Sequence, residues 1–159
     1  MKIGVLGDSH RNKKNIDMAL QKLVDEGIDL IFHTGDNFMD SKYINEKYNI
    51  DIIAVKGNCD FENVEEDLVF EIEDKKIFLT HGHKYLVKYG VGELFNKAKY
   101  LNCDVVIFGH SHIPFLEKKD NVYILNPGSI SLPRGGSKKS FAIIEILESK
   151  ISIEHMIVD

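Results

Sequence analysis

The stretch from residue 105 to 112 constrains the fold of this chain more than any other part of the sequence. Its first four residues, Val-Val-Ile-Phe, are typical of a strand that is buried on both faces. Gly109 interrupts the run, and His110 and His112 follow it. Open α/β sheets usually build their sites at the carboxyl ends of such strands, and neutral imidazole is the commonest metal ligand near physiological pH. The pair is therefore either part of a metal site or two polar residues in a turn, and the other strand ends decide between these.

The composition is that of an ordinary globular protein. The chain has 159 residues, of which 43% are hydrophobic and 28% charged, so we expect a single domain over residues 1–159 with a sizeable core. The formal net charge of −5 argues against nucleic acid as a partner. No apolar run approaches the roughly 20 residues that a membrane span needs. Cys59 and Cys103 are the only cysteines, which indicates no disulfide framework and predicts a cytoplasmic protein.

Hydrophobic patterning in the first third of the chain predicts strands that alternate with helices. Apolar strands are expected at residues 2–6, 29–32 and 51–55, and helices at 15–26 and 41–48. Gly27 follows the first helix, as expected for a helix end. This order is the signature of βαβ units and predicts a parallel sheet.

The remaining sequence predicts many more strands and one further helix. We expect the helix at residues 91–101, and strands at 68–73, 76–80, 104–109, 115–118, 122–125, 140–147 and 151–158. Several consecutive strands are separated by short polar turns, which favours antiparallel hairpins. The total exceeds what one five-stranded sheet would need. We therefore predict an α/β fold in which two mixed sheets pack face to face with helices outside.

Residues with metal-binding side chains follow every buried strand of this kind. They are Asp8 and His10, Asp36, Asn58, His81, and His110 with His112. Each has another explanation, since Asp8 is suited to capping the next helix and Asp36 and Asn58 to Asx turns, while His81 fits a half-buried, hydrogen-bonded histidine. Turn formation does not require all five strand ends to carry metal-type donors, so the set as a whole indicates a metal site.

The types of donor narrow the choice of metal. Two aspartates, one asparagine and four histidines, with no thiolate in the best positions, suit Mn²⁺, Fe or Zn²⁺ better than a Cys-rich zinc site or an all-oxygen calcium site. Seven ligands are too many for one catalytic ion with an open position. They fit two ions that share a carboxylate and lie about 3.5–4 Å apart, an arrangement suited to phosphoryl chemistry.

Five ordered motifs resemble those of the calcineurin-like metallophosphoesterases. They are Asp8-Ser9-His10, Gly35-Asp36, Gly57-Asn58, His81-Gly82-His83 and Gly109-His110-Ser111-His112. The chain length and the tetrapeptide Asn126-Pro127-Gly128-Ser129 resemble the small YfcE-like phosphodiesterase branch of this family. From Asp8 to Ser129 the motifs span about three quarters of the chain.

This resemblance implies a four-layer α/β/β/α sandwich of two mixed β-sheets flanked by helices. It implies one metal on Asp8, His10 and His112, and a second on Asn58, His81 and His110, with Asp36 bridging; Asp36, Asn58 and His110 would also act in catalysis. The implied ions are manganese first, with nickel, cobalt, iron or zinc as alternatives. A metal-bridging hydroxide would attack a small phosphodiester in line, and self-association into a homo-oligomer is possible.

Cys59 departs from the family pattern. Many members have histidine after the asparagine, where it is thought to stabilise the transition state or protonate the leaving group, and a thiol cannot act as an imidazolium donor. Small YfcE-like members often carry cysteine here as well. We therefore expect a shift in substrate range towards activated esters with good leaving groups.

Other residues near the motifs carry weaker hypotheses. Arg11 and Arg134 are candidates to face a phosphate, His83 to line the site, and the turn at 126–129 to direct backbone donors towards the metals, although solvent exposure or turn chemistry explains each equally well. The alternatives to a phosphodiesterase are a phosphomonoesterase or nuclease of the same fold, or a noncatalytic interaction scaffold, a use known from a retromer subunit that resembles this branch.

Overall fold

A computed structural model describes residues 1–159 and contains two five-stranded sheets. In the first sheet the strand order is β10-β9-β1-β2-β3. Its members are β1 (Lys2–Leu6), β2 (Leu30–His33), β3 (Ile52–Ala54), β9 (Ser140–Leu147) and β10 (Lys150–Ile157). β1, β2 and β3 pair in parallel, whereas β9 is antiparallel to both β1 and β10. The sheet is therefore mixed, with its parallel part built from the first third of the chain.

The second sheet has the order β4-β5-β6-β8-β7. Its members are β4 (Asp67–Ile72), β5 (Lys75–Thr80), β6 (Val105–Ile107), β7 (Phe115–Lys119) and β8 (Val122–Asn126). β5, β6 and β8 run in parallel, and β4 and β7 are antiparallel edge strands. Each sheet thus has three adjacent parallel strands whose carboxyl ends lie at one edge, as a site at strand ends requires.

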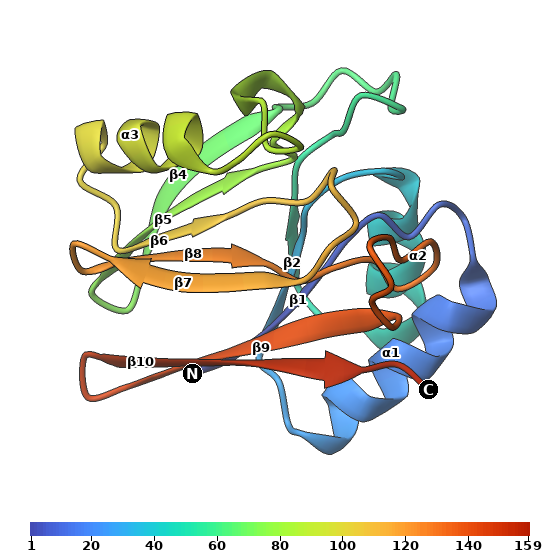
Figure 1. The fold of residues 1–159 in the computed structure, drawn as a ribbon. Coiled ribbons are helices and arrows are strands. Elements are labelled where there is room, and N and C mark those ends of the chain that lie inside the picture. The colour runs from blue at the N-terminus through green and yellow to red at the C-terminus, as the bar shows by residue number, and fades with distance from the viewer.

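Helices cover the outer face of each sheet (Figure 1). α1 (Lys13–Asp25) and α2 (Met39–Tyr48) pack on the first sheet through one apolar cluster, and α3 (Gly92–Tyr100) packs on the second through another. A short 3-10 helix, η1 (His83–Tyr85), follows β5. None of these helices has the length and hydropathy needed to cross a membrane. The four-layer α/β/β/α sandwich predicted from the sequence is confirmed.

Alternation along the strands explains this layering. On β6, Val105 and Ile107 belong to the cluster between the sheets, whereas Val106 packs towards α3. On β1, Ile3 and Val5 face the opposite sheet and Leu6 belongs to the cluster under α1 and α2. Both strands are therefore buried on both faces, as their continuous apolar sequence predicted.

Most element boundaries differ from the predictions by one or two residues. One change bears on the site: of the stretch from 104 to 109, only Val105–Ile107 forms the strand β6. Phe108 and Gly109 are buried, and their N–H groups still donate to the carbonyl oxygens of Leu125 at 2.9 Å and His81 at 3.0 Å. The histidines beyond them lie on a loop rather than on the strand itself.

Candidate metal centre

The seven side chains predicted as metal ligands converge where the parallel strands of both sheets end. Asp8 and His10 follow β1, Asp36 follows β2 and Asn58 follows β3, all in the first sheet. From the second sheet, His81 follows β5, and His110 and His112 follow β6. Short contacts described below connect all seven into one cluster. Residues up to about a hundred positions apart are thus brought together by the pairing of the two sheets.

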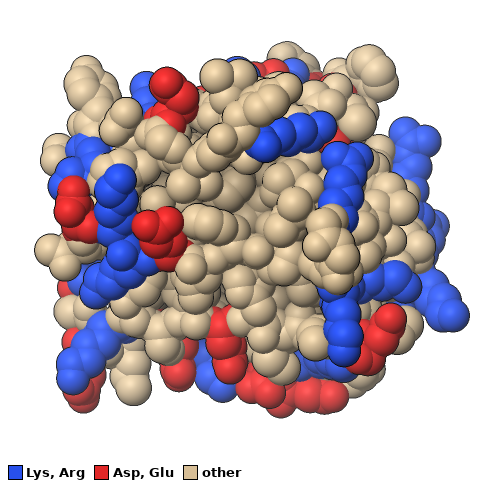
Figure 2. Space-filling model, in the orientation of Figure 1, with Lys and Arg blue, Asp and Glu red and all other residues tan.

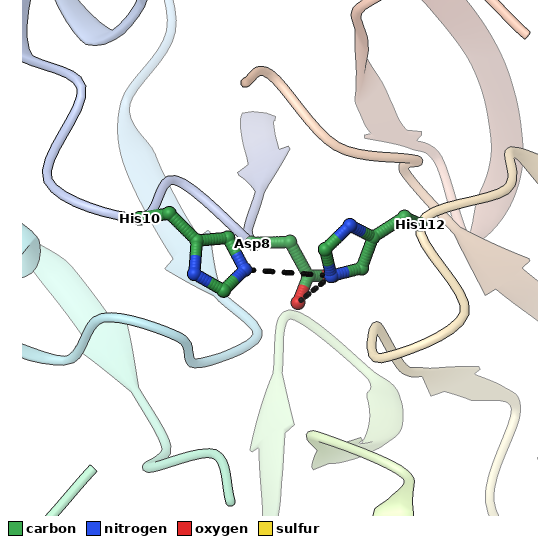
Figure 3. A group of neighbouring side chains, drawn as sticks. All are labelled: Asp8, His10 and His112. Carbon is green, nitrogen blue, oxygen red and sulfur yellow. Dashed lines mark hydrogen bonds and ion pairs between the residues drawn. The ribbon is translucent and has the colours of Figure 1, made fainter. Parts of the chain in front are cut away.

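One group consists of Asp8, His10 and His112 (Figure 3). Nε2 of His112 lies 3.2 Å from Oδ1 of Asp8 and 3.4 Å from Nε2 of His10. Nδ1 of His112 lies 2.7 Å from the carbonyl oxygen of Leu132. Because a carbonyl oxygen only accepts, Nδ1 carries the proton, and Nε2 directs its lone pair at the carboxylate. Oδ1 of Asp8 has no hydrogen-bond donor, whereas Oδ2 accepts from the His110 N–H at 3.0 Å. With His112 in this tautomer, no positive charge neutralises the negative charge on Oδ1.

The pKa of His112 reflects the negative charge of Asp8 beside it. Burial alone would lower it, but the hydrogen bond and charge of Asp8 outweigh burial and raise the pKa above its usual value. A proton on Nε2 of His112 is one way to neutralise the charge on Oδ1 of Asp8. A bound cation is the other, and it would also accept the lone pair on Nε2 of His10.

A second group forms around His81. Nδ1 of His81 lies 2.7 Å from the carbonyl oxygen of Thr34, which fixes the proton on Nδ1 and leaves the Nε2 lone pair free. This Nε2 is 3.0 Å from Oδ1 of Asn58, 3.2 Å from Nδ1 of His110 and 3.5 Å from Oδ2 of Asp36. Burial, followed by the charge of His81, lowers the pKa of His110 to about 4. His110 is then neutral near neutral pH and can offer a lone pair.

Asp8 connects the two groups. Its carboxylate lies within ligand range of His10 and His112 on one side and of Asp36 and His81 on the other. The sequence led us to expect Asp36 alone between two ions, and the geometry adds Asp8 as a second carboxylate common to both groups. Two sets of converging lone pairs on oxygen and imidazole nitrogen fit divalent ions of the manganese, iron and zinc type.

Left-handed backbone positions allow this convergence. Asp8, His10, Asp36, His110 and His112 all have positive φ, between 46° and 67°. Such angles are uncommon for residues other than glycine and are strained, and they cluster at functional sites. The strand-end loops therefore turn sharply to direct these side chains inward.

Two glycines allow the loops to approach each other closely. A Cβ at Gly109 would lie 2.6 Å from Oγ1 of Thr34 and 2.8 Å from Oδ2 of Asp8. A Cβ at Gly57 would lie 2.0 Å from Oδ1 of Asp36. Any side chain at either position would displace a candidate ligand, so both glycines are required by space rather than by φ.

A buried hydrogen-bond chain behind the first group was missed from the sequence. The Gly35 N–H donates to Nδ1 of His33 at 3.1 Å, so Nε2 of His33 carries the proton and donates to Oγ of Ser9 at 3.0 Å. Oγ of Ser9 in turn donates to Oδ2 of Asp40, which also accepts from the Arg11 N–H at 2.9 Å. The chain joins the loops after β1 and β2 to the first turn of α2. No sequence motif pointed to Asp40.

Asp60 holds the loops of the second group in a similar way. Its Oδ2 accepts from the N–H groups of Asp36 at 3.0 Å and Gly57 at 2.8 Å, and its Oδ1 accepts from the Phe38 N–H at 3.0 Å. The only available signal was its position, directly after the Asn58-Cys59 pair.

Cys59 itself is exposed, and its N–H donates to Oδ1 of Asp36 at 3.0 Å. Partial desolvation of its sulfur and the nearby Asp36 raise the pKa of the Cys59 thiol.

The turn at 126–129 supports the loops instead of directing donors at the metals. Nδ2 of Asn126 donates to the Gly109 carbonyl at 3.1 Å and to Oγ of Ser111 at 2.9 Å. Oγ of Ser129 donates to the Asp8 carbonyl at 2.8 Å. The structural explanation of this tetrapeptide therefore holds.

The remaining hypotheses have mixed outcomes. α1 is capped by Asn12, whose Oδ1 accepts from the Asn15 N–H at 3.1 Å, so capping by Asp8 is wrong. The ring of His83 lies 5.5 Å from that of His81 between centroids, beside the second group. Arg11 is exposed.

Known proteins are similar to this chain in sequence and in fold. Residues 1–149 match the family model described as the calcineurin-like phosphoesterase superfamily domain. The probable metallophosphoesterase YsnB of Bacillus subtilis is 33% identical over 148 residues, covering 92% of this chain and 85% of YsnB. The phosphodiesterase MJ0936 of Methanocaldococcus jannaschii is 36% identical over 145 residues, covering 80% of this chain and 83% of MJ0936.

A solved structure agrees over almost the whole chain. It is that of a conserved uncharacterized protein, a predicted phosphoesterase, from Streptococcus pneumoniae, with a TM-score of 0.83 and 30% identity, and the alignment covers 99% of this chain and 89% of that one. The resemblance found in the five motifs is thereby confirmed. The chain belongs to the calcineurin-like phosphoesterase superfamily and is a metal-dependent phosphoesterase.

Proposed function

We propose that this protein is a phosphodiesterase that uses two divalent metal ions, manganese first among them. The main support is the convergence of imidazole lone pairs on two neighbouring groups that share the Asp8 carboxylate, whose Oδ1 is buried without a hydrogen-bond partner. Ligands to the first ion would be Asp8, His10 and His112, and ligands to the second Asn58, His81 and His110. Asp36 would lie between them together with Asp8.

Two divalent ions, when bound, would neutralise charge on the phosphate oxygens and lower the pKa of a water molecule that attacks phosphorus. The chain would keep the ligands oriented. The Leu132 and Thr34 carbonyls hold His112 and His81 in the tautomer that leaves Nε2 free. The Cys59 N–H occupies Oδ1 of Asp36 and so directs Oδ2 towards His81.

The side chain at position 59 bears on the leaving group. Hydrolysis forms a P–O bond from water and breaks the P–O bond to the ester alcohol, which leaves most readily when its oxygen is protonated or intrinsically stable. Cys59 provides no imidazolium to donate that proton. Esters of acidic alcohols such as p-nitrophenol should therefore react faster than simple alkyl esters.

A preference for diesters is supported by the printed name of MJ0936, which is similar over most of its length. The net charge of −5 argues against a nuclease, because a duplex binder needs a basic surface that releases counterions. A noncatalytic scaffold would have no need of seven intact candidate ligands, and all seven are present and in contact here.

The test is metal-dependent hydrolysis by the metal-free protein as Mn²⁺ is added. Bis(p-nitrophenyl) phosphate and p-nitrophenyl phosphate would be compared, with manganese content measured on the same samples. We expect hydrolysis of the diester to rise with Mn²⁺ and to exceed that of the monoester. Binding of manganese without hydrolysis of either ester would contradict the enzyme assignment, and faster monoester hydrolysis would contradict the diester preference.

A further inference from the structure

An apolar cavity lies beside the metal centre, and the role of its lining is not explained by metal binding. Its volume is about 510 Å³, and Ser111, the residue between His110 and His112, forms part of its wall. The Ser111 hydroxyl accepts from Nδ2 of Asn126 at 2.9 Å, which fixes this wall in place. The cavity is therefore continuous with the loop that carries one histidine of each group.

The interior of the cavity is formed by hydrophobic side chains. They are Val87, Val91, Phe108, Ile113 and Phe115. The rings of Phe108 and Phe115 lie 6.3 Å apart between centroids and are tilted by 59°. Two tilted rings with branched aliphatic side chains around them form a surface suited to a flat apolar group, because aromatic pairs favour tilted or offset contact.

Charged residues at the cavity are of both signs. Lys88 and Arg134 also line it, and the Arg134 N–H donates to the His112 carbonyl at 3.2 Å, so the backbone of Arg134 lies beside a candidate ligand. Two cations in the lining of a cavity that borders the loop of His110 and His112 favour an anionic group, such as a phosphate, at that end.

Glu117 narrows the choice of occupant. This exposed carboxylate lines the cavity on β7, and it would repel a second phosphate or carboxylate placed in the apolar part. Figure 2 shows a mainly uncharged area in the middle of this face, with basic and acidic side chains around it. The occupant should therefore be anionic at the metal end and neutral and apolar in the cavity.

We propose that this cavity binds a neutral aromatic ring carried on one ester oxygen of the substrate, so that aryl and nucleoside phosphodiesters are preferred over small alkyl ones. The proposal rests on the proposed function, since it takes the phosphate to lie at the metal centre. It assigns to Ile113, Val91 and the two phenylalanines a role in substrate specificity that metal binding does not require.

The test compares the binding of two non-hydrolysable anions to the manganese-loaded protein by calorimetry. Phenylphosphonate carries a ring and methylphosphonate does not, while their phosphonate groups are alike. We expect phenylphosphonate to bind about tenfold more tightly, a modest discrimination for a hydrophobic pocket. Equal binding of the two phosphonates would overturn the proposal. Absence of Mn²⁺-dependent hydrolysis of methyl p-nitrophenyl phosphate would instead count against the proposed function, and the ring preference is measured independently of it.

Two matched variants test whether the preference for phenylphosphonate comes from this cavity. Ile113, 43% exposed, lines the cavity, whereas Leu116, 41% exposed, lies on β7 and does not. Ile113→Ser should reduce the preference for the ring to about threefold or less, and Leu116→Ser should leave it unchanged. An equal effect of both variants would overturn the proposal. So would a lower association state of Ile113→Ser with unchanged phosphonate binding, because a neighbouring copy would then be the occupant.

Val91→Ser serves as a second cavity variant that should fold well. Val91 precedes α3 as its N-cap and makes no side-chain capping bond, a position that serine suits better than valine. The variant should weaken phenylphosphonate more than methylphosphonate. Equal weakening of both anions would contradict a contact with the ring.

Discussion

The two groups of candidate ligands differ in how firmly the chain holds them before an ion binds. In the first group, Asp8 is fully buried and His112 is 3% exposed, with its ring fixed by Leu132. In the second group His81 is equally buried, but Asn58 is exposed and His110 is only half-buried. His10, the third member of the first group, is half-buried. The first group is thus the more enclosed of the two, and the second opens to solvent at Asn58.

This difference suggests separate tasks for the two groups. Ligands that are already fixed lose little freedom when an ion binds, so the first group should bind its ion more tightly. The open group has room for water and substrate and should exchange its ion more readily. The two ions would therefore differ in affinity and in exchange rate, although the ligand types of the two groups are similar.

The largest expected effect comes from removing the carboxylate common to both groups. Asp8→Asn keeps the shape of the side chain but loses its charge, so we expect neither ion to be retained. Each ion is worth several kcal/mol to charge stabilisation, so hydrolysis of bis(p-nitrophenyl) phosphate should fall by about 10³-fold or more. Manganese content and rate are measured on the same sample. Two retained ions would refute the sharing of Asp8.

Variants that remove a ligand from only one group test the two groups separately. His112→Ala removes a buried ligand of the first group, and Asn58→Ala removes an exposed ligand of the second. We expect each variant to retain one ion, with losses in rate of about 10²-fold or more for His112→Ala and about tenfold for Asn58→Ala. Metal content after dialysis provides the measurement. A larger loss for Asn58→Ala would reverse the ranking of the groups.

A supporting residue should affect only the first group. Asp40 accepts from Ser9 and from the Arg11 N–H, both on the loop after β1. Asp40→Asn should lower the affinity of the tighter ion about tenfold, the lower range for residues that orient ligands, and leave the weaker ion unchanged.

Asp17→Asn is the matched control for Asp40→Asn. Asp17 also accepts side-chain hydrogen bonds, from Tyr43, Tyr48 and Lys47, but it lies on α1 and contacts none of the candidate ligands. This variant should leave both metal affinities unchanged. Equal losses of metal affinity in the two variants would mean that Asp40 acts through general stability.

The smallest expected effect is a pH dependence of stability at Asp17, outside both groups. Burial would raise the pKa of this carboxyl, but hydrogen bonds from Lys47, Tyr48 and Tyr43 lower it below its usual value. A lowered folded-state pKa stabilises the protein above the unfolded pKa of about 3.9, and this contribution disappears as pH falls through the folded value. The side chain is 34% exposed, so the contribution should be below about 1 kcal/mol.

Urea unfolding of the metal-free protein checks this pH dependence. Asp17→Asn should be slightly less stable than the wild type near neutral pH, and the two should converge as pH falls through the lowered folded-state pKa of Asp17. A difference that stays constant across this range would show that the hydrogen-bond geometry, and not the charge, is responsible.

Much of the fold was predictable because burial leaves a local record. The apolar run at 105–108 reflects a strand that is buried on both faces, and the helical spacing at 15–26 reflects a helix that is buried on one face. The positions of the seven candidate ligands are also local in the sequence, since each lies within five residues of the end of a parallel strand. The order of these residues in five motifs also predicted the superfamily to which the chain belongs.

The connections between loops were not predictable, because they depend on contacts between distant residues. Asp40 reaches Ser9 across 31 positions, and Ser129 reaches Asp8 across 121. Neither contact leaves a local pattern in the sequence. The sharing of Asp8 between the groups is likewise a result of how the two sheets pack, which residue spacing does not encode.

The most direct test of this two-group metal centre is a calorimetric titration of the metal-free protein with Mn²⁺. We expect two ions per chain that bind in two distinguishable steps, with the tighter step absent in His112→Ala and the weaker step absent in Asn58→Ala. A single ion per chain, or two steps that both variants weaken equally, would contradict the division of this site into a closed and an open group.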